Sequence, residues 1–419
     1  MKIKTSFILC RQRILENKLV IHGGLLALIA VGAFCALLGL RQKAVALFSQ
    51  VHRTTRLNGM RFLVEPYIFA NRNVTYHGDR GRIEKGICRF FGGRISVLKE
   101  PGPGGERGVL FAMFTEMIPL MFATMDLPRL AADFTIVSEP SWSGYCDEAF
   151  LRCTQLKEDI FVLAAQKDDY AFLQRLRSNL IAVDLGPCDW VDPRVAEPFI
   201  HNAKEFDIVM NSHWGSSKRH YVLFRMMRRA KRRYKVLLIG GNWGGKTASD
   251  VAALADYYDV KDQLTFVEHI PYERVMDLTC RAKVSLLLSL KEGSNRAIAE
   301  SIFCNVPVIV LSTHVGGIVK NVQPETGLLV EEAGLEDSVE KLHDSKLNPR
   351  EWGMTHISFT QSSKKLNDIL QAHAVRTGRP WTVGIAARSN SPESKYANAD
   401  DARRLGPWNR DLASYLIHF

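Results

Sequence analysis

The chain has 419 residues, of which 46% are apolar and 24% are charged, so it can build folded cores and is not a disordered protein. This length predicts two domains rather than one. The net charge of +11 favours an anionic partner, such as a membrane surface, a phosphate-bearing substrate or nucleic acid. Eight cysteines occur without a Cys-x-x-Cys pair, and Cys146 and Cys153 are the closest two. We expect reduced, buried thiols, with no disulfide framework and no zinc site.

The N-terminal region predicts a membrane helix. Residues 1–18 form a basic tail, and residues 19–40 are apolar except for His22. At about 1.5 Å per residue, a helix over 19–40 can cross a hydrocarbon core of roughly 30 Å. A monotopic hairpin or a buried helix is the alternative. Basic residues flank the apolar stretch on both sides, so the charge pattern leaves its orientation open.

Residues 41–94 are expected to form a basic connecting segment. Its second half, from Arg72 to Arg94, is rich in basic residues and glycine. Such a stretch is usually a solvated surface. The alternative is contact with anionic lipid head groups, at about 1 kcal/mol for each well-placed basic residue.

From residue 95 the pattern alternates between strands and helices. Strands are predicted over 108–115, 133–137, 160–165 and 179–184, with a helix over 168–177. This alternation is typical of a parallel sheet with crossover helices, and it predicts an N-terminal Rossmann-like domain over 95–190. The loop after the strand 133–137 contains three candidates for binding a substrate hydroxyl or sugar face, which are Glu139, Trp142 and Asp147. The alternative is that Glu139 and Trp142 only shape and cap the turn.

A second series of strands and helices predicts another domain over 191–348, after a turn-rich linker at 186–193. Strands are expected over 206–211, 234–241 and 264–270, and helices over 212–233 and 272–282. The stretch from Val284 to Ser312 then predicts a strand, a helix capped by Ser294 or Asn295, and another strand.

Two acidic residues bracket this last helix start. Glu292 lies where the strand ends and Glu300 lies on the helix. Ligands of parallel sheets bind outside the carboxyl ends of the strands. A carboxylate there can accept hydrogen bonds from sugar or ribose hydroxyls, while the free N–H groups of a helix start can hold a phosphate.

This arrangement resembles the Glu-x7-Glu motif of the retaining glycosyltransferases of family 4. Two further stretches are similar to that family: Thr313–Ile318 resembles its glycine loop, and Thr326–Val330 resembles its Gly-Leu-Leu-Val strand. The resemblance is good over 205–345 and fair over 95–190. It implies an α/β protein of the GT-B fold, in which two Rossmann-like domains face a cleft, here with an N-terminal membrane helix added.

The resemblance also implies roles for individual residues. Glu292 would contact the donor sugar as the catalytic residue, and Glu300 would bind the ribose. Lys218 and Arg219 would hold the nucleotide diphosphate, where the charge of the leaving group develops. Backbone groups near the donor would come from Gly293, Ser294, Gly316 and Gly317, and the first domain would bind the acceptor.

The chain departs from the family pattern in two places. Ser212-His213 replaces the family's Gly-Arg pair ahead of Lys218, so either Arg219 supplies the second cation or the diphosphate is held more weakly. Gly293-Ser-Asn-Arg296 replaces a loop that usually carries glycine and aromatic residues, which puts the sugar preference in doubt. Lys218 and Arg219 have an alternative of their own, as members of a solvated basic helix face.

The function implied is a membrane-associated retaining glycosyltransferase of polysaccharide biosynthesis, which moves a sugar from a nucleotide-diphosphate sugar to a glycan or lipid-linked acceptor. No metal or other cofactor is expected. The donor implies cytoplasmic catalytic domains beside a single-pass helix at an anionic membrane surface. The alternatives are a catalytically inactive GT-B protein that binds nucleotide sugars, and a basic nucleic-acid-binding protein, which the scarcity of interleaved aromatics disfavours. Residues 349–419 are predicted to hold a crossing helix over 350–373, broken near Gly353, then a loop over 378–398 and a short helix over 408–419.

Overall fold

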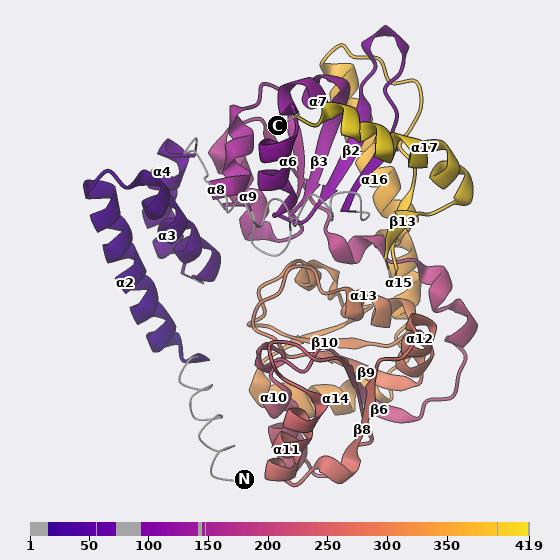
Figure 1. Cartoon of the computed structure of the whole chain (residues 1–419). Helices are drawn as coiled ribbons and strands as arrows, with labels where there is room; N and C mark the ends of the chain where they lie inside the picture. Colours follow the sequence, from indigo (N-terminus) through magenta and orange to yellow (C-terminus); the bar gives the residue numbers. More distant parts are fainter. Residues whose placement is uncertain are drawn as a thin grey trace. The chain divides into compact units, whose positions relative to one another are not determined.

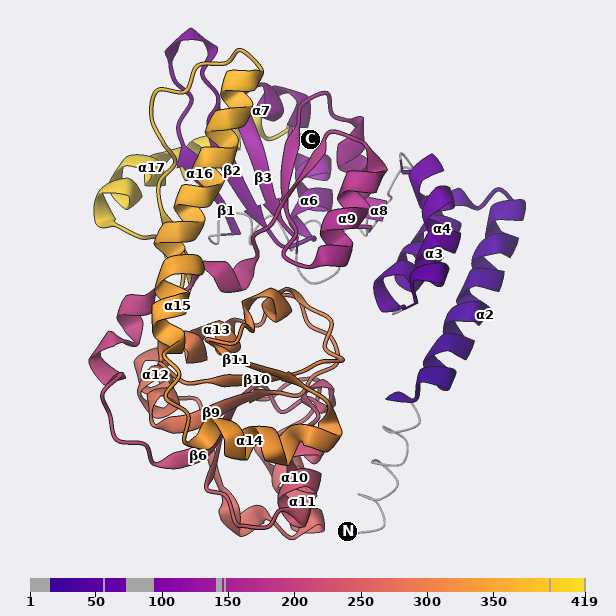
Figure 2. The same ribbon diagram turned by 180° about the vertical axis from the view of Figure 1, so that it is seen from behind.

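The computed structural model describes residues 16–55, 57–72, 94–140, 145–146, 148–391 and 393–417 (Figures 1 and 2). These residues form two compact α/β units. The first domain contains residues 16–184, 366–387 and 396–417 of the described chain, and the second domain contains residues 185–365 and 388–395. Two α/β domains with mainly parallel sheets are the building blocks of the GT-B class that the sequence predicts.

The first domain is built on a five-stranded sheet in the order β1-β2-β3-β4-β5. The strands are β1 (Ile95–Lys99), β2 (Gly108–Met113), β3 (Phe134–Glu139), β4 (Ile160–Leu163) and β5 (Leu180–Val183). Only β1 runs antiparallel to its neighbour. All six residues of β2 are buried, which is expected of a strand covered on both faces. The four strands predicted in this region are therefore present.

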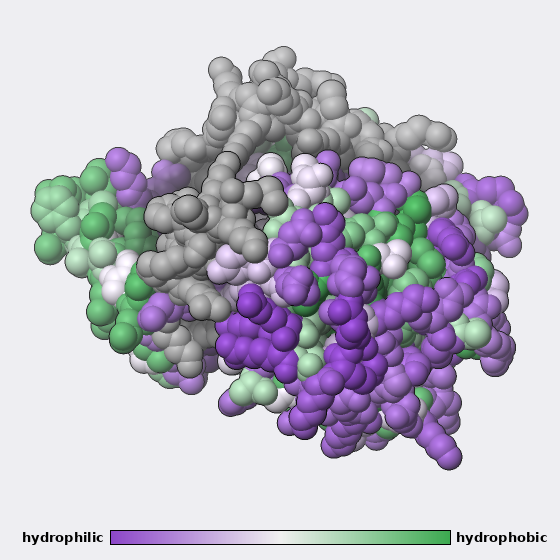
Figure 3. All heavy atoms as spheres, turned by 90° about the horizontal axis from the view of Figure 1, so that it is seen from below, coloured by the Kyte–Doolittle hydropathy of each residue, from purple (hydrophilic) through white to green (hydrophobic). Residues whose placement is uncertain are grey.

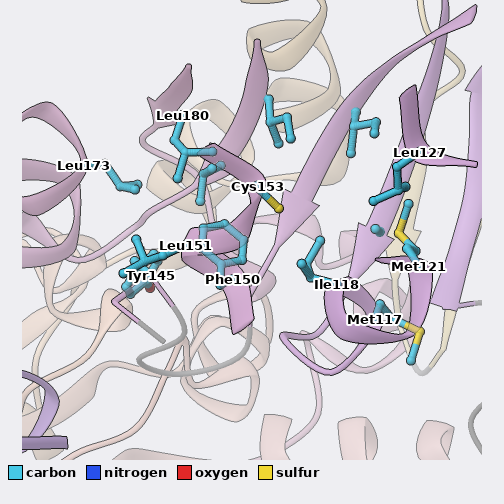
Figure 4. Close-up of a cluster of buried hydrophobic side chains, with 14 of the residues drawn as sticks. Met117, Ile118, Met121, Leu127, Tyr145, Phe150, Leu151, Cys153, Leu173 and Leu180 are labelled. Carbon is cyan, nitrogen blue, oxygen red and sulfur yellow. The ribbon is translucent and has the colours of Figure 1, made fainter. Parts of the chain in front are cut away.

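Helices precede, separate and follow the strands of this sheet along the chain. They are α2 (Lys18–Leu37), α3 (Arg41–Thr54), α4 (Asn58–Ala70), α6 (Met117–Thr124), α7 (Leu127–Asp133), α8 (Glu148–Leu151), α9 (Lys167–Leu176) and α17 (Ala399–Asp411). Figure 4 shows part of the core between them and the sheet, including Met121, Phe150 and Leu180. Residues 41–94, expected as a connecting segment, thus begin with two packed helices, while 73–93 lie outside the described residues.

The second domain contains a six-stranded parallel sheet in the order β11-β10-β9-β6-β7-β8. Its strands are β6 (Phe206–Asn211), β7 (Val236–Gly240), β8 (Leu264–Glu268), β9 (Ala282–Leu287), β10 (Val308–Leu311) and β11 (Gly327–Val330). Its helices are α10 (His220–Arg229), α11 (Ala248–Tyr258), α12 (Tyr272–Cys280), α13 (Arg296–Phe303), α14 (Leu335–His343) and α15 (Pro349–His356). This is the strand order of a doubly wound nucleotide-binding sheet, with its switch point between β6 and β9.

Several predicted boundaries were wrong. The helix expected over 212–233 is α10, which starts only at His220 because Arg219 adopts a left-handed conformation (φ 58°). The helix expected over 350–373 breaks at Ile357, not at Gly353, and resumes as α16 (Phe359–Arg376). Gly353 instead lets α15 approach Ile302 of α13, since a Cβ there would lie 2.9 Å from that side chain.

The remaining segments are more ordered than predicted. The linker at 186–193 contains a short 3-10 helix (Pro187–Trp190) whose last three residues are buried in the second domain. The loop expected over 378–398 contains a small sheet of β12 (Arg388–Asn390) and β13 (Ser394–Tyr396). All six cysteines in the described residues are free thiols, and five of them are buried.

A buried ion pair ties the C-terminal part of the chain to the sheet of the first domain. Lys99 Nζ of β1 lies 2.5 Å from Glu106 Oε1, and both side chains are 1% exposed. The backbone N–H and hydroxyl of Thr382 also donate to the Glu106 carboxylate, at 2.7 and 2.6 Å. Burial alone would raise the pKa of Glu106, but the bonds from Lys99 and Thr382 outweigh it and lower this pKa to about 2.

We predict that Glu106→Gln lowers the free energy of unfolding by about 3–5 kcal/mol, because Lys99 is left as an unpaired buried charge. Chemical denaturation followed by circular dichroism measures this. The stabilisation from Glu106 is present above its unfolded pKa of about 4.5 and is lost as the pH falls toward 2. The gap between wild type and variant should therefore narrow from pH 5 to pH 3. A constant gap would contradict the assignment.

Candidate functional site

The switch point of the second sheet brings two loops together. β6 and β9 are neighbours, with Ile208 opposite Val284, yet the chain leaves them toward opposite edges of the sheet. Their carboxyl ends therefore lie side by side, at the place where sheets of this kind bind ligands. We call the space between the loop after Asn211 and the loop after Leu287 the crevice. Lys218 lies in the first loop and Glu292 in the second.

Lys218 and Glu292 form an ion pair in this crevice. Lys218 Nζ lies 2.5 Å from Glu292 Oε1, and Asn295 donates to the other carboxylate oxygen at 2.7 Å. Burial raises the pKa of Glu292, but the Lys218 ammonium beside it outweighs burial and the pKa lies below its ordinary value. Glu292 is thus ionised near neutral pH. Lys218 has three donors, so an anionic ligand can bind it while the pair persists.

Arg219 is adjacent to Lys218 in sequence but is held elsewhere. Its guanidinium donates to the Leu288 carbonyl at 3.1 Å and to Glu332 at 2.5 Å. Arg225 binds the other oxygen of the same Glu332 carboxylate. In this structure the charge of Arg219 is therefore engaged in fixing the end of β9 to the segment after β11.

Glu300 is buried on α13, with an exposure of only 3%. The Tyr272 hydroxyl donates to its Oε1 at 2.8 Å, and Arg296 Nε lies 2.9 Å from the same oxygen. Burial is the main influence on this carboxyl and raises its pKa, although both partners oppose the shift. Both donors bind Oε1, so Oε2 keeps acceptor capacity for a ligand hydroxyl.

The predicted glycine loop lies against the Glu292 loop. Glu292 N donates to the Val315 carbonyl at 3.0 Å, and Gly317 N donates to the Gly293 carbonyl at 2.6 Å. A Cβ on Gly316 would lie 2.7 Å from the Glu292 carbonyl and 2.6 Å from the His314 ring. Ser294 follows in the same loop, and Asn295, not Ser294, caps α13 by accepting from Ile298 N at 2.9 Å.

A pair of aromatic rings stands beside the ion pair and was missed by the sequence analysis. His213, after β6, stacks on Trp243, after the neighbouring strand β7, with ring centroids 5.1 Å apart. Trp243 is 64% exposed. Burial, helped by the Lys218 charge, lowers the pKa of His213, so its ring is neutral near pH 7. The signal in the sequence was a tryptophan directly after a strand's carboxyl end.

The acceptor candidates of the first domain are only partly described. Glu139 ends β3 and is buried, and its carbonyl accepts from Phe114 N at 2.8 Å. Trp142 and Asp147 lie outside the described residues. Within the part of the chain that the structure describes, no group of three or more His, Cys, Asp or Glu side chains could hold a metal ion.

The tight approach at Gly316 gives a prediction. Gly316→Ala should lower the free energy of unfolding by about 1–3 kcal/mol, since the added methyl group meets two backbone carbonyls and a ring. The matched control is Gly334→Ala, because a Cβ at Gly334 meets nothing within 4 Å. Equal unfolding midpoints for the two variants in urea would contradict this account.

Comparison with known proteins finds similarity that is confined to part of this chain. Residues 194–353 match the family model "Glycosyl transferases group 1". The phosphatidylinositol N-acetylglucosaminyltransferase GPI3 subunit of Saccharomyces cerevisiae (strain YJM789) is 24% identical over 170 residues, which cover 40% of this chain and 36% of the yeast protein. This chain therefore matches about a third of that relative's length.

Solved structures of low sequence identity also align. Sucrose-phosphate synthase from Thermosynechococcus elongatus has a TM-score of 0.48 and 18% identity, covering 64% of this chain and 73% of that chain. Anabaena Alr3699/HepE in complex with UDP-glucose has a TM-score of 0.49 and 10% identity, covering 75% and 89%. Residues 194–353, which lie in the second domain, are thus similar to the glycosyl transferases group 1 family.

Proposed function

We propose that this chain is a membrane-associated retaining glycosyltransferase, which moves a sugar from a nucleotide-diphosphate sugar to a glycan or lipid-linked acceptor. The observation that carries this proposal is the Lys218–Glu292 pair at the switch point of a doubly wound sheet, inside the segment matched to group 1 glycosyltransferases. Sheets of this kind bind nucleotides at that point.

The donor would bind along the two loops of the crevice. Lys218 would hold the diphosphate and stabilise the negative charge that develops as the sugar departs. Glu292, kept ionised by Lys218, would accept hydrogen bonds from the donor sugar. Glu300 would accept a ribose hydroxyl at Oε2, with its carboxylate positioned by Tyr272. Gly293, Ser294, Gly316 and Gly317 belong to the loops beside Glu292, where their backbone groups would lie near the donor.

The second cation of the family pattern has no direct substitute at its own position. His213 stands there as a neutral ring, and Arg219 is engaged with Glu332. Arg219 would reach a diphosphate only by exchanging Glu332 for the ligand. We therefore assign the main phosphate contact to Lys218 and to loop N–H groups.

Trp243 would supply binding energy in place of that cation. One face of the ring is covered by His213 while the side chain is mostly exposed, so a nucleobase can stack on it. Stacking of a base on an aromatic ring is worth about 1–3 kcal/mol.

The acceptor side is less defined. In a retaining reaction of this family type, the acceptor hydroxyl attacks from the face that the phosphate leaves, so a dedicated protein base is not required. Glu139, Trp142 and Asp147 remain our candidates for orienting the acceptor. The name of the yeast relative, which refers to phosphatidylinositol, supports a lipid-linked acceptor.

Membrane association is part of the proposal. Within the described residues, one helix, Leu19–Leu37, is long and apolar enough to cross a membrane. The donor class favours catalytic domains on the cytoplasmic side, and a role in polysaccharide biosynthesis fits such a location. The sequence predicts a single-pass helix there.

A catalytically inactive GT-B protein is the second candidate. The observation that favours it is the loss of the second cation, with a neutral His213 in its place. Such a protein would bind a nucleotide sugar without transferring or hydrolysing it.

We predict that one family of nucleotide sugars raises the melting temperature of the full chain in mild detergent by a few degrees. A ligand at a hundred times its Kd adds about 2.7 kcal/mol, which corresponds to a few degrees for a chain of this size. The shift should disappear in Lys218→Ala and in Glu300→Gln, and persist in the control Gly334→Ala. Unchanged shifts in both site variants would remove the assignment. Donor turnover in the same samples separates the enzyme from the inactive protein.

We predict that Trp243→Ala weakens the Kd of that nucleotide by about tenfold or more, because the stacking surface is lost. Trp243→Phe should restore most of the affinity. Isothermal titration calorimetry measures both. Equal affinity in wild type and Trp243→Ala would show that the base binds elsewhere.

A further inference from the structure

The N-terminal helices of the first domain expose an unusual amount of apolar surface. Of the seventeen large apolar side chains that are exposed in the described residues, eleven lie between Leu19 and Leu63. Those on α2 include Leu26, Val31, Phe34 and Leu37, and those on α4 are Phe62 and Leu63. Figure 3 shows hydrophobic side chains gathered at the edge of the molecule where α2 to α4 lie in Figure 1. Contiguous exposed patches of this kind mark protein or membrane contacts.

The opposite face of α2 is packed on protein. Leu25 is 3% exposed, and a Cβ on Gly32 would lie 2.7 Å from the Phe48 ring of α3. The two helices are joined by a tight turn through Gly39, whose φ of 74° is left-handed. α3 therefore runs back alongside α2, as Figures 1 and 2 both show.

α3 and α4 are in turn fixed to the α/β core of the first domain. Glu65 of α4 binds His52 of α3 at 2.8 Å and Arg175 of α9 at 2.6 Å. Arg61 of α4 pairs with Asp168 of α9, and Cys146 Sγ lies 3.7 Å from the Ser49 carbonyl. These contacts make the three helices a packed part of the first domain.

This packing is incompatible with α2 crossing a bilayer. The helix is long enough, at about 30 Å for its twenty residues. However, a crossing α2 would carry α3 with it, together with the domain to which α3 is bound. Crossing would thus require α2 to separate from α3 along its whole packed face.

We propose that α2 to α4 form a monotopic membrane-docking surface, in which α2 lies along an anionic bilayer and immerses only its outer face. The charge pattern selects this occupant. No acidic residue occurs between Glu16 and Glu65, while Arg41 and Lys43 are exposed at the start of α3. Basic residues at a bilayer surface contribute about 1 kcal/mol each with anionic lipids. This proposal revises the single-pass expectation and does not depend on the proposed sugar transfer.

Topology is the first test. The full chain carries one epitope tag before Met1 and another after Phe419, and sealed inverted vesicles from the expressing cells are treated with protease. A monotopic surface leaves both tags on the same side, so both are cleaved in the same vesicles. Cleavage of one tag and protection of the other would establish a crossing helix and overturn the proposal.

Lipid dependence is the second test. The purified full chain is floated with vesicles of phosphatidylcholine alone or with 30% phosphatidylglycerol. We expect binding to the anionic vesicles, which Arg41→Glu/Lys43→Glu lowers by about tenfold or more. The control is Lys341→Glu/Lys346→Glu, which makes the same charge change at exposed positions of the second domain and should bind as wild type does.

The outcomes separate the possible occupants. Equal loss in both charge variants would mean that net charge, not this surface, controls binding. If the chain binds neither kind of vesicle and is an oligomer in water, another copy of the protein covers α2. Binding that resists Arg41→Glu/Lys43→Glu and alkaline extraction would mean stable insertion. Each of these three results would overturn the proposal.

Discussion

The second domain depends on one topological constraint, which is that the chain turns from one half of its sheet to the other between β6 and β9. Right-handed crossovers then carry the chain from β6 to β7 on one side and from β9 to β10 on the other. The loops that follow β6 and β9 therefore diverge from neighbouring positions at the middle of the sheet. Charged groups from segments 74 residues apart in sequence meet there, as Lys218 and Glu292 do. The glycine at 316 is needed because a third loop closes on the same place.

In the same site, the neighbours of each charged side chain determine its pKa and its partners. Two glutamates on one motif have opposite pKa shifts, because Glu292 faces a lysine while Glu300 is buried more completely. Arg219 and Arg225 share one carboxylate, Glu332, so this cluster keeps a net positive charge although both guanidinium groups are engaged. In the proposed donor complex, a ligand diphosphate would meet Lys218, itself paired with Glu292, and loop N–H groups, so such a site would rely on backbone geometry as much as on charge.

Much of this organisation could be predicted from the sequence, and the failures have physical causes. The apolar runs of β6, β9 and β10 are buried strands, so their pattern is local and was interpreted correctly. The start of α10 was not predictable from its own pattern: Arg219 before it has a left-handed φ, and its side chain binds Glu332, 113 residues later. Likewise, nothing adjacent to Trp243 in the sequence indicates that His213 covers one of its faces. The two acidic residues were noticed because their spacing is short, and Arg296 lies only four residues before Glu300, whereas Tyr272, 28 residues before Glu300, required the fold.

The division of the first domain along the chain has a consequence for how the protein is made. The core that contains Val51 and Phe150 also contains Leu405, Leu412 and Tyr415, and the buried Glu106 binds Thr382. During synthesis, the second domain has nearly all of its residues before these arrive. The domain that begins first is therefore completed last, and its sheet must leave the ribosome with part of its core uncovered. A chain that stops near residue 360 would lack residues that complete the core of the first domain, so the first domain would not fold although nearly all of the second domain precedes the truncation.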